Sequence, residues 1–168
     1  GGDVRSTQTI DLSTARIVHP ADLTKRETKA IEMLQDEVAK RSRITLETST
    51  EWPASGDPVI AVLPFRSLSL IDGRLELEVA DSAPEGYHIR VDSDRTTVFA
   101  IGNDERGVLF GVGYLLRNLR IERDSLVFSA DHQISTAPAY GLRGHQIGYR
   151  DKVNSYDGWD LPQWEQYI

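Results

Sequence analysis

The sequence predicts an α+β fold: a mixed, mainly antiparallel β-sheet with two helices packed on one of its faces. The predicted elements run strand, helix, several strands, helix, strand, which is typical of this class. The first helix is charged on its outer side, as expected for a helix that lies on one face of a sheet. In the second helix, Gly107 and Gly111 lie one turn apart. Because glycine costs about 1 kcal/mol in a helix interior, this pair indicates a helix pressed closely against the sheet.

The first strand and the first helix follow each other directly. Residues 14–19 form a short β-branched run ended by a proline, which predicts a strand. A helix is predicted over about residues 23–41, with Asp22 or Thr24 as its N-cap and Glu27 at capping-box distance from Thr24. Apolar residues then recur at helical spacing, namely Ile31, Leu34 and Val38.

Three further segments are predicted to contribute strands. Residues 43–49 and 58–64 are strand candidates separated by a turn-rich stretch, and the second is apolar throughout, which indicates a central strand. Residues 67–79 have alternating leucines around Asp72-Gly73, a dipeptide that favours a two-residue turn. A first hairpin is therefore predicted there.

A second hairpin, a second helix and a final strand follow. In residues 86–102, Tyr87, Ile89 and Val91 alternate with polar residues, a polar turn follows at 92–95, and residues 97–101 run back, which predicts a hairpin. The second helix is predicted at about 104–120 with Asn103 or Asp104 as cap, and residues 124–131 are predicted to be a strand. The apolar stripe of the helix consists of Val108, Val112, Leu115 and Leu119.

Composition excludes several classes of function. The chain has 168 residues and a formal net charge of −7, and no run of Lys or Arg, so we do not expect it to bind nucleic acid. It has no cysteine, which excludes disulfides, thiolate metal sites and a cysteine nucleophile but does not identify the compartment. No apolar run approaches the roughly 18 residues of a membrane span.

Two motifs have a structural explanation that needs no ligand. Gly102, Gly107, Gly111 and Gly113 do not match a dinucleotide fingerprint, because the glycines after the first lie inside the helix rather than at its turn. Close packing explains them better. The acidic pair that begins with Asp104 lies at a helix N-terminus, where carboxylates cap backbone N–H groups, so capping is the expected role.

The residues before the C-terminal segment offer no site chemistry. His19, His88 and His132 are expected at strand ends or on the surface, and with His145 they form no metal-binding spacing. No nucleophile motif is present. We therefore predict no metal, no cofactor and no catalytic residue within this chain.

The C-terminal segment differs in character. Six of the thirteen aromatic residues lie after residue 135, together with many hydrogen-bonding side chains. Aromatic faces and planar hydrogen-bonding groups are the combination that recognises sugars, although an interdomain seam is enriched in the same types. The crowded residues are Arg143, His145, Gln146, Tyr149, Arg150, Asn154, Tyr156 and Trp159, and all but Tyr156 are our candidate substrate-binding residues.

The stretch APEGYHIRVDSDRTTVFAIGNDERGVLFGVGYLLRNLR, residues 83–120, carries a family resemblance. It resembles the N-terminal accessory domain, hexosaminidase domain 2-like, of family 20 β-hexosaminidases and of α-glucuronidases. The resemblance extends loosely over about residues 14–135. It implies that a (β/α)₈ catalytic barrel follows the domain directly.

The barrel start is similar to APAYGLRGHQIGYR, so the resemblance implies a first barrel strand at residues 140–144 and the start of its first helix at 161–168. The chain would then end inside an incomplete first βα unit of the barrel. Arg143 matches the hexosaminidase arginine that holds hydroxyls of the terminal sugar. Gly148 stands where those enzymes carry an aspartate, and Arg150 falls one place early, which favours a related family acting on a uronic acid or another sugar.

The sequence thus predicts a disordered segment at 1–13, an α+β accessory domain at 14–135, and a linker with the start of a truncated barrel at 136–168. The expected function is the non-catalytic N-terminal domain of a glycoside hydrolase, itself inactive, that supports the barrel. Its partners would be the missing barrel of the same polypeptide and, through it, a carbohydrate substrate. The alternative is an independent carbohydrate-binding or protein-interaction module. For the parent protein we expect a periplasmic or secreted location.

Overall fold

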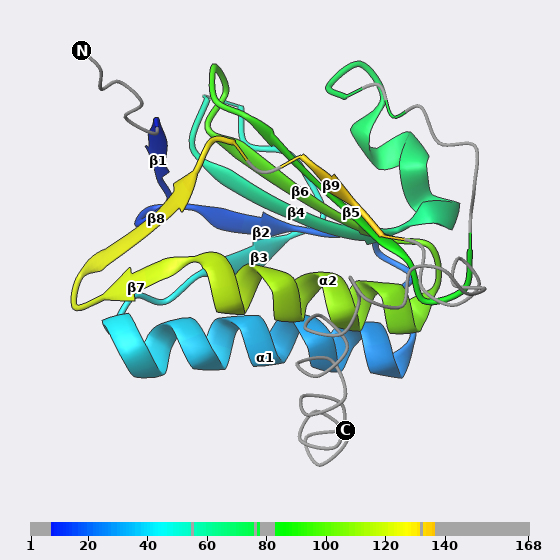
Figure 1. The fold of residues 1–168 in the computed structure, drawn as a ribbon, viewed down its shortest axis with the longest axis horizontal. Helices are drawn as coiled ribbons and strands as arrows, with labels where there is room; N and C mark the ends of the chain where they lie inside the picture. Colours follow the sequence, from blue (N-terminus) through cyan, green and yellow to red (C-terminus); the bar gives the residue numbers. More distant parts are fainter. Residues whose placement is uncertain (1–7, 55, 76, 78–82, 132, 137–168) are drawn as a thin grey trace, which may run out of the picture.

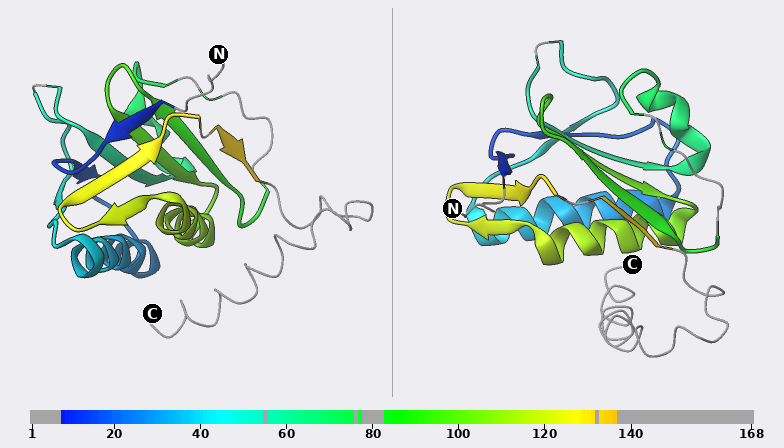
Figure 2. Two further views of the ribbon diagram at one scale, coloured as in Figure 1. Left: turned by 60° about the vertical axis from the view of Figure 1, so that its left-hand side comes forward. Right: turned by 45° about the horizontal axis from the view of Figure 1, so that its top comes forward.

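Two long helices lie side by side against one face of a β-sheet (Figures 1 and 2). The computed structural model describes residues 8–54, 56–75, 77, 83–131 and 133–136, and everything below concerns these residues. The helices are α1 (Lys25–Ser42) and α2 (Glu105–Asn118). Both pack their apolar sides into one core with the sheet. The predicted α+β class, the two helices and their common face are confirmed.

The larger sheet is mixed. Its order is β3 (Glu47–Ser49), β2 (Arg16–Val18), β4 (Val59–Pro64), β6 (Thr97–Gly102), β5 (Tyr87–Asp92) and β9 (Ile134–Ser135). The pairings from β3 to β6 are parallel, and those of β5 with β6 and β9 are antiparallel. With the two antiparallel pairings of the smaller sheet, antiparallel contacts are in the majority over the described residues.

The smaller sheet corrects the prediction for the N-terminus. It consists of β1 (Thr9–Asp11), β8 (Ser125–Ser129) and β7 (Arg120–Glu122), in that order. Disorder was expected over residues 1–13, and for 9–11 this is wrong. Ile10 is buried opposite Phe128 of β8, and the N–H of Leu12 donates to Leu126 O at 2.7 Å. The apolar side chains of this segment are buried against β8, which lies more than a hundred residues further along the chain.

The central strands are covered on both faces. Every residue of β4 and of β6 is buried, and side chains alternate between two apolar clusters as the strand period requires. Ile60 and Val62 face the helices, whereas Ala61 and Leu63 face the opposite side. This two-sided burial explains why residues 58–64 are apolar throughout, and it confirms the central position predicted for them.

Both helices start at the predicted caps. The Thr24 hydroxyl accepts from the N–H of Glu27 at 3.1 Å, and the Glu27 carboxylate accepts from the N–H of Thr24 at 2.9 Å, which completes the capping box. At the start of α2, Asp104 Oδ1 accepts from the N–H of Gly107 at 2.8 Å. The capping role expected for Asp104 is therefore confirmed.

The glycines of α2 allow close approach, as predicted, but to different degrees. A Cβ on Gly107 would collide with the carbonyl oxygen of Gly86, in the turn before β5. A Cβ on Gly111 would lie 3.5 Å from Cβ of Tyr87, which is ordinary van der Waals contact. Of these two glycines, only Gly107 is therefore sterically obligatory.

The hairpin predicted at residues 67–79 is wrong in its first strand, whereas residues 76, 78 and 79 of its second strand lie outside the described residues. A 3₁₀ helix, η2 (Phe65–Ile71), starts directly after β4, and Gly73 follows it in a turn with φ of +80°. The apolar side chains of η2 pack on the sheet face that the long helices leave open. Their alternation therefore reflected burial against that face and not a strand.

The second predicted hairpin is confirmed by the antiparallel pairing of β5 with β6, from Tyr87 opposite Gly102 to Asp92 opposite Thr97. After it, α2 ends at Asn118, earlier than the predicted 120. The strand β7 then begins at Arg120, and its pairing with β8 forms a hairpin that the sequence analysis did not predict. The predicted strand at 124–131 corresponds to β8.

Candidate functional site

The predicted substrate-binding residues lie outside the described residues, so the structure does not place them. They are Arg143, His145, Gln146, Tyr149, Arg150, Asn154 and Trp159. The domain boundary predicted at residue 136 also stays a prediction. Two places in the described part of the chain bring polar side chains together: a hollow at the strand ends and the end of β9.

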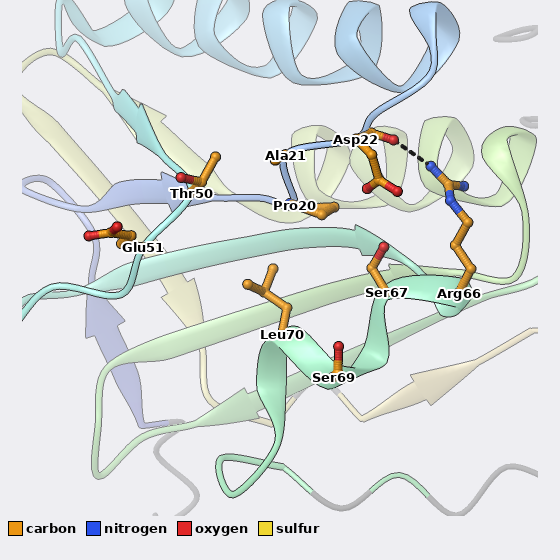
Figure 3. A pocket seen from close by; sticks show the side chains of 9 residues that line it. All are labelled: Pro20, Ala21, Asp22, Thr50, Glu51, Arg66, Ser67, Ser69 and Leu70. Carbon is orange, nitrogen blue, oxygen red and sulfur yellow. Dashed lines mark hydrogen bonds between the residues drawn. The ribbon is translucent and has the colours of Figure 1, made fainter.

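The hollow lies at the carboxyl ends of the parallel strands β2, β3 and β4, where α/β sheets commonly bind ligands (Figure 3). Its volume is about 470 Å³. The rim is mostly exposed and polar. Its lining residues are Pro20, Ala21, Asp22, Thr50, Glu51, Arg66, Ser67, Ser69 and Leu70.

Arg66, at one end of this hollow, is held by protein groups. Its Nη1 donates to Glu27 Oε2 at 2.9 Å and its Nη2 to Glu27 Oε1 at 2.8 Å. Nη2 also donates to the backbone oxygen of Asp22 at 2.9 Å, the bond drawn in Figure 3. Hydrogen bonds to the Glu27 carboxylate raise the pKa of Arg66 above its ordinary value. The guanidinium therefore joins the start of α1 to η2. Three of its N–H groups already donate to protein oxygens and are not available to a ligand.

The hollow offers little catalytic chemistry. Glu27, which adjoins it, is the only buried carboxylate among the described residues, and its oxygens already accept from Arg66 and from the N–H of Thr24. No group of three or more His, Cys, Asp or Glu side chains in the described ranges could hold a metal ion. The hollow is best explained as a surface depression beside a structural ion pair.

The second place is the end of β9, where a network of side chains fixes the chain just before residue 137. We call this network, formed by His88, Arg90, Asn103, Ser135 and Thr136, the exit anchor. The N–H of Thr136 donates to Tyr87 O at 2.9 Å, and the N–H of Tyr87 donates to the Thr136 hydroxyl at 3.2 Å. The backbone therefore stays paired with β5 up to residue 136.

Arg90 supplies the charged part of the exit anchor. Its Nη1 donates to Ile134 O at 2.7 Å and to Ile89 O at 2.9 Å, and its Nη2 donates to the Ser135 hydroxyl at 2.8 Å. Burial lowers the pKa of Arg90. A single guanidinium thus holds both residues of the short strand β9 on the edge of the sheet.

His88 extends the network to the start of α2. Its Nδ1 lies 2.8 Å from Ser135 Oγ and its Nε2 lies 3.0 Å from Asn103 Oδ1. The Asn103 amide nitrogen donates to Ala83 O at 2.8 Å, which orients Oδ1 toward the histidine and assigns the N–H to Nε2. In the neutral imidazole, Nδ1 then accepts from the Ser135 hydroxyl. Every donor therefore meets an acceptor along the series from Arg90 to Ser135, His88, Asn103 and the backbone oxygen of Ala83.

His88 also corrects a prediction. It was expected at a strand end or on the surface, but it is buried within β5. Its neighbours Tyr87 and Ile89 alternate toward the helices, so an outward direction was the natural expectation. The outward face is itself covered there, since the ring of Phe65 lies 6.4 Å from the His88 ring between centroids. His19 lies directly after β2, as expected, and His132 is outside the described residues.

No protein-family model matches the chain, and no curated protein matches it by sequence. Solved structures do match its fold. A family GH115 4-O-methyl-α-glucuronidase with specificity for decorated arabinogalactans is 13% identical, with a TM-score of 0.56 over 73% of this chain and 17% of its own.

Two enzymes of family GH20 give similar results. The exo-β-N-acetylglucosaminidase from Vibrio harveyi is 15% identical, with a TM-score of 0.53 over 83% of this chain and 18% of its own. The β-N-acetylhexosaminidase from Streptomyces coelicolor A3(2) is 18% identical, with a TM-score of 0.53 over 85% of this chain and 25% of its own. The chain therefore spans a quarter or less of these glycoside hydrolases, and the likeness concerns the fold. No helix in the described ranges is long and apolar enough to cross a membrane.

Proposed function

We propose that this chain is the non-catalytic N-terminal domain of a glycoside hydrolase acting on glycans, and that it supports a catalytic barrel beginning after residue 136. The exit anchor carries this proposal. Three side chains from two segments, Arg90, His88 and Asn103, are used to fix Ser135 and its surroundings. Fixing the backbone at residues 134–136 would set the direction in which the polypeptide continues from the domain toward the barrel.

The carboxylates of the described residues support a non-catalytic role. Glycosidases place two carboxyl groups on either side of the scissile bond, one of them a proton donor. The one buried carboxylate in the described ranges, Glu27, accepts three hydrogen bonds and forms a bidentate ion pair. It is committed to the fold. The acid and base of the parent enzyme would therefore belong to the barrel.

The structural neighbours support the glycan-related part of the proposal. Enzymes of two glycoside hydrolase families, GH115 and GH20, contain a region with this fold, and in each it is a minor share of the chain. A fold shared at such low identity argues for a common architectural role more than for a common substrate. The resemblance of residues 83–120 to accessory domains agrees with this reading.

The alternative, an independent carbohydrate-binding or protein-interaction module, would need an exposed aromatic platform. Trp52 does not provide one. Its Nε1 donates to Leu70 O at 2.9 Å, and the Arg74 guanidinium carbon lies 4.0 Å from the ring centroid, over the ring face. Phe65 packs against the second apolar cluster. Trp52 and Phe65, the two aromatic residues predicted in loops, therefore make contacts within the domain and do not form an exposed binding platform.

The 168-residue chain should hydrolyse no glycoside. Because no proton donor and nucleophile are paired in its described residues, we expect release of nitrophenol from aryl β-N-acetylglucosaminides, aryl α-glucuronides and other aryl glycosides to equal the buffer blank. The full-length parent protein serves as the positive control and should cleave at least one of these or a natural glycan. Turnover by the purified 168-residue chain would refute the non-catalytic assignment.

Substituting Arg90 should weaken the pairing of β9 with β5 at the edge of the sheet. In Arg90→Met, the two residues of β9 lose two hydrogen bonds from a charged donor, each worth roughly 1.5–3 kcal/mol when intact. We expect the amide of Thr136 to exchange with solvent at least tenfold faster by NMR-detected hydrogen exchange. The matched control is Arg95→Met in the adjacent turn, where Arg95 forms only an exposed ion pair with Asp92. Equal exchange rates in the two variants would show that Arg90 does not anchor β9.

A further inference from the structure

The end of the domain where both long helices terminate is basic, although the chain as a whole is acidic. Residues 37–43 lie at the end of α1, and residues 117–124 run from the end of α2 through β7 to the turn before β8. These two short ranges contain six cations and three carboxylates, in a chain whose formal net charge is −7. The six cations are all exposed: Lys40, Arg41, Arg43, Arg117, Arg120 and Arg123. Positive charge is therefore concentrated at this end.

A backbone hydrogen bond joins the two ranges. The N–H of Asp124 donates to Ser42 O at 2.8 Å. Arg41 and Arg43 flank Ser42 in the chain, and Arg123 directly precedes Asp124. Since adjacent Cα atoms are about 3.8 Å apart, the Cα atoms of these three arginines lie at most about 14 Å from one another. Figures 1 and 2 show the end of α1 beside β7 and the turn that follows it.

Four of the six cations form what we call the arginine cluster, namely Arg41, Arg43, Arg120 and Arg123. Among the residues that the structure describes, none of these four forms an ion pair with a carboxylate. Lys40 is different, because its Nζ lies 3.3 Å from Glu37 Oε2. Arg117 also has a partner, so neither of these two residues is counted in the cluster. The exposed guanidinium groups of the cluster are thus accessible to a ligand.

The helix ends explain only part of this charge. The C-terminus of a helix carries about half a negative charge, which favours cations in the last turn. Two such ends lie side by side here, but six exposed cations are more than they need. Arg43 moreover has a φ of +74°, a conformation that glycine adopts freely and that costs conformational free energy for arginine. The cluster therefore carries more charge, and at Arg43 a less favourable residue, than the fold itself requires.

The chemistry of the cluster suits a ligand that bears both carboxylates and hydroxyls. Guanidinium groups recognise carboxylates because two parallel N–H groups match the two carboxylate oxygens. Glu122 and Arg120 lie on the side of β7 opposite to Ile121, which packs on the main apolar cluster. Glu122 and Asp124 are exposed and can accept hydrogen bonds from hydroxyl groups. An acidic polysaccharide, in which uronic acid units carry the carboxylates, has both kinds of group.

A nucleic acid fits this surface less well. A duplex carries one negative charge per roughly 1.7 Å of its axis, so its phosphates would also meet Glu122 and Asp124. In an acidic polysaccharide, neutral hydroxyls lie between the carboxylates and can face these two side chains. Exposed charges further apart than about 8 Å are largely screened at physiological ionic strength. The negative charge of the rest of the chain therefore does not prevent a contact that is confined to this end.

We propose that the arginine cluster binds the uronate carboxylates of an acidic polysaccharide. This deepens the proposed function, on which it rests, by naming the class of glycan that the domain holds for its parent enzyme. The cluster lies far from the exit anchor. Asn103 of the anchor precedes α2 and Arg120 of the cluster follows it, and the 14 residues of α2 span about 21 Å at 1.5 Å per residue. A glycan can therefore occupy the cluster while the polypeptide continues from residue 136 at the other end.

An NMR titration of the full 168-residue chain with an oligogalacturonate tests the proposal. We expect the amide signals of residues 41–43 and 120–124 to shift and to saturate, while the signals of η2 stay unchanged. The methyl ester of the same oligosaccharide has no free carboxylate and should cause no such shifts. Because exposed ion pairs weaken in salt, the dissociation constant should rise about threefold or more when the ionic strength is raised to about 0.5 M. Unshifted signals, or equal shifts with the methyl ester, would overturn the proposal.

Two variants test the residues of the cluster. The combined Arg120→Gln and Arg123→Gln variant removes two exposed charges outside both helices and should raise the dissociation constant about fivefold or more. The matched control, Lys25→Gln with Lys29→Gln, removes two exposed charges from the first half of α1 and should leave binding within about twofold. Arg43→Gly removes both the charge and the backbone strain, so it should weaken binding without lowering the melting temperature. If both cluster variants bind as the control does, the proposed contacts are wrong.

Other partners give distinguishable results. Tighter binding of a DNA oligonucleotide than of the oligogalacturonate would identify a general anion-binding surface and would overturn the proposal. Equal binding of poly-glutamate would identify a surface for acidic peptides and would overturn it too. The titration involves no substrate turnover. An inactive parent protein would therefore refute the proposed function while leaving a positive titration standing, and a negative titration would leave the non-catalytic assignment untouched.

Discussion

Arg66→Met should lower the free energy of unfolding by about 2–3 kcal/mol, the larger part of the roughly 3–5 kcal/mol that removing one partner of a buried ion pair costs. Glu27 is fully buried, and in the variant its carboxylate keeps only the N–H of Thr24 as a donor. The Arg66 side chain is 44% exposed, so water can enter and reduce the penalty. For a chain of this size we expect the melting temperature to fall by about 4–10 °C in a calorimetric scan.

The matched control is the exposed pair of Lys40 and Glu37 on α1, whose Nζ and Oε2 atoms are 3.3 Å apart. Lys40 is 66% exposed, and Lys40→Met should change stability by less than about 0.5 kcal/mol. The comparison separates burial from the mere presence of an ion pair. If the two variants melt at the same temperature, the Arg66–Glu27 pair does not secure the start of α1.

Gly107→Ala should also destabilise the fold, by about 1–2 kcal/mol net, although alanine is the better helix former. The new Cβ would occupy the place of the Gly86 carbonyl oxygen, which is backbone and already accepts from the N–H of Asn103 at 2.8 Å. Overpacking of this kind costs about 1–3 kcal/mol or more, while the gain in helix propensity is about 1 kcal/mol. Chemical denaturation at equilibrium gives the difference in unfolding free energy.

Gly111→Ala, one turn further along α2, is the control. Its Cβ would meet Tyr87 Cβ at 3.5 Å and Ala100 Cβ at 3.8 Å, which is ordinary contact. We expect this variant to be neutral or to stabilise the protein by up to about 1 kcal/mol. Destabilisation of both variants to the same degree would mean that the sheet tolerates no side chain along this side of α2, and that the distinction drawn from the structure is wrong.

Local signals predicted the regular elements well. The capping box at Thr24 and Glu27 and the cap at Asp104 are satisfied within a few residues, so the sequence shows them directly. The same holds for the β5–β6 hairpin, whose two strands are joined by a short polar turn. The close approach at Gly107 also follows from a local cost, because glycine inside a helix needs a packing reason.

Predictions failed where a distant partner decides the outcome. The leucines of η2 alternate like a strand, but a sheet face formed by β4 and β6 receives them. Residues 9–11 pair with β8, far along the chain, and nothing within the N-terminal segment indicates this. His88 is buried because Phe65 covers the face toward which it points. In each case the determining contact is tertiary.

The candidate site divides in the same way. The sugar-type residues such as Arg143 and Trp159 were recognised from local composition, and they lie outside the described residues, so their role stays a prediction. The exit anchor was missed. Arg90, Asn103 and Ser135 are ordinary polar residues in sequence, and only the pairing of β9 with β5 brings them together. The one local signal belongs to β5, where His88 and Arg90 alternate with apolar residues.

The pairing of β1 with β8 has a consequence for how the chain folds during synthesis. Thr9 pairs with Ser129, a separation of 120 residues, so β1 emerges from the ribosome long before its partner. At roughly 5–20 residues per second, β1 waits about 6–24 s, far longer than helix or hairpin formation requires. The helices and the central strands can assemble in that interval. Closure of the smaller sheet has to wait for β8, and until then Ile10 and Leu12 lack the partners that bury them in the folded protein.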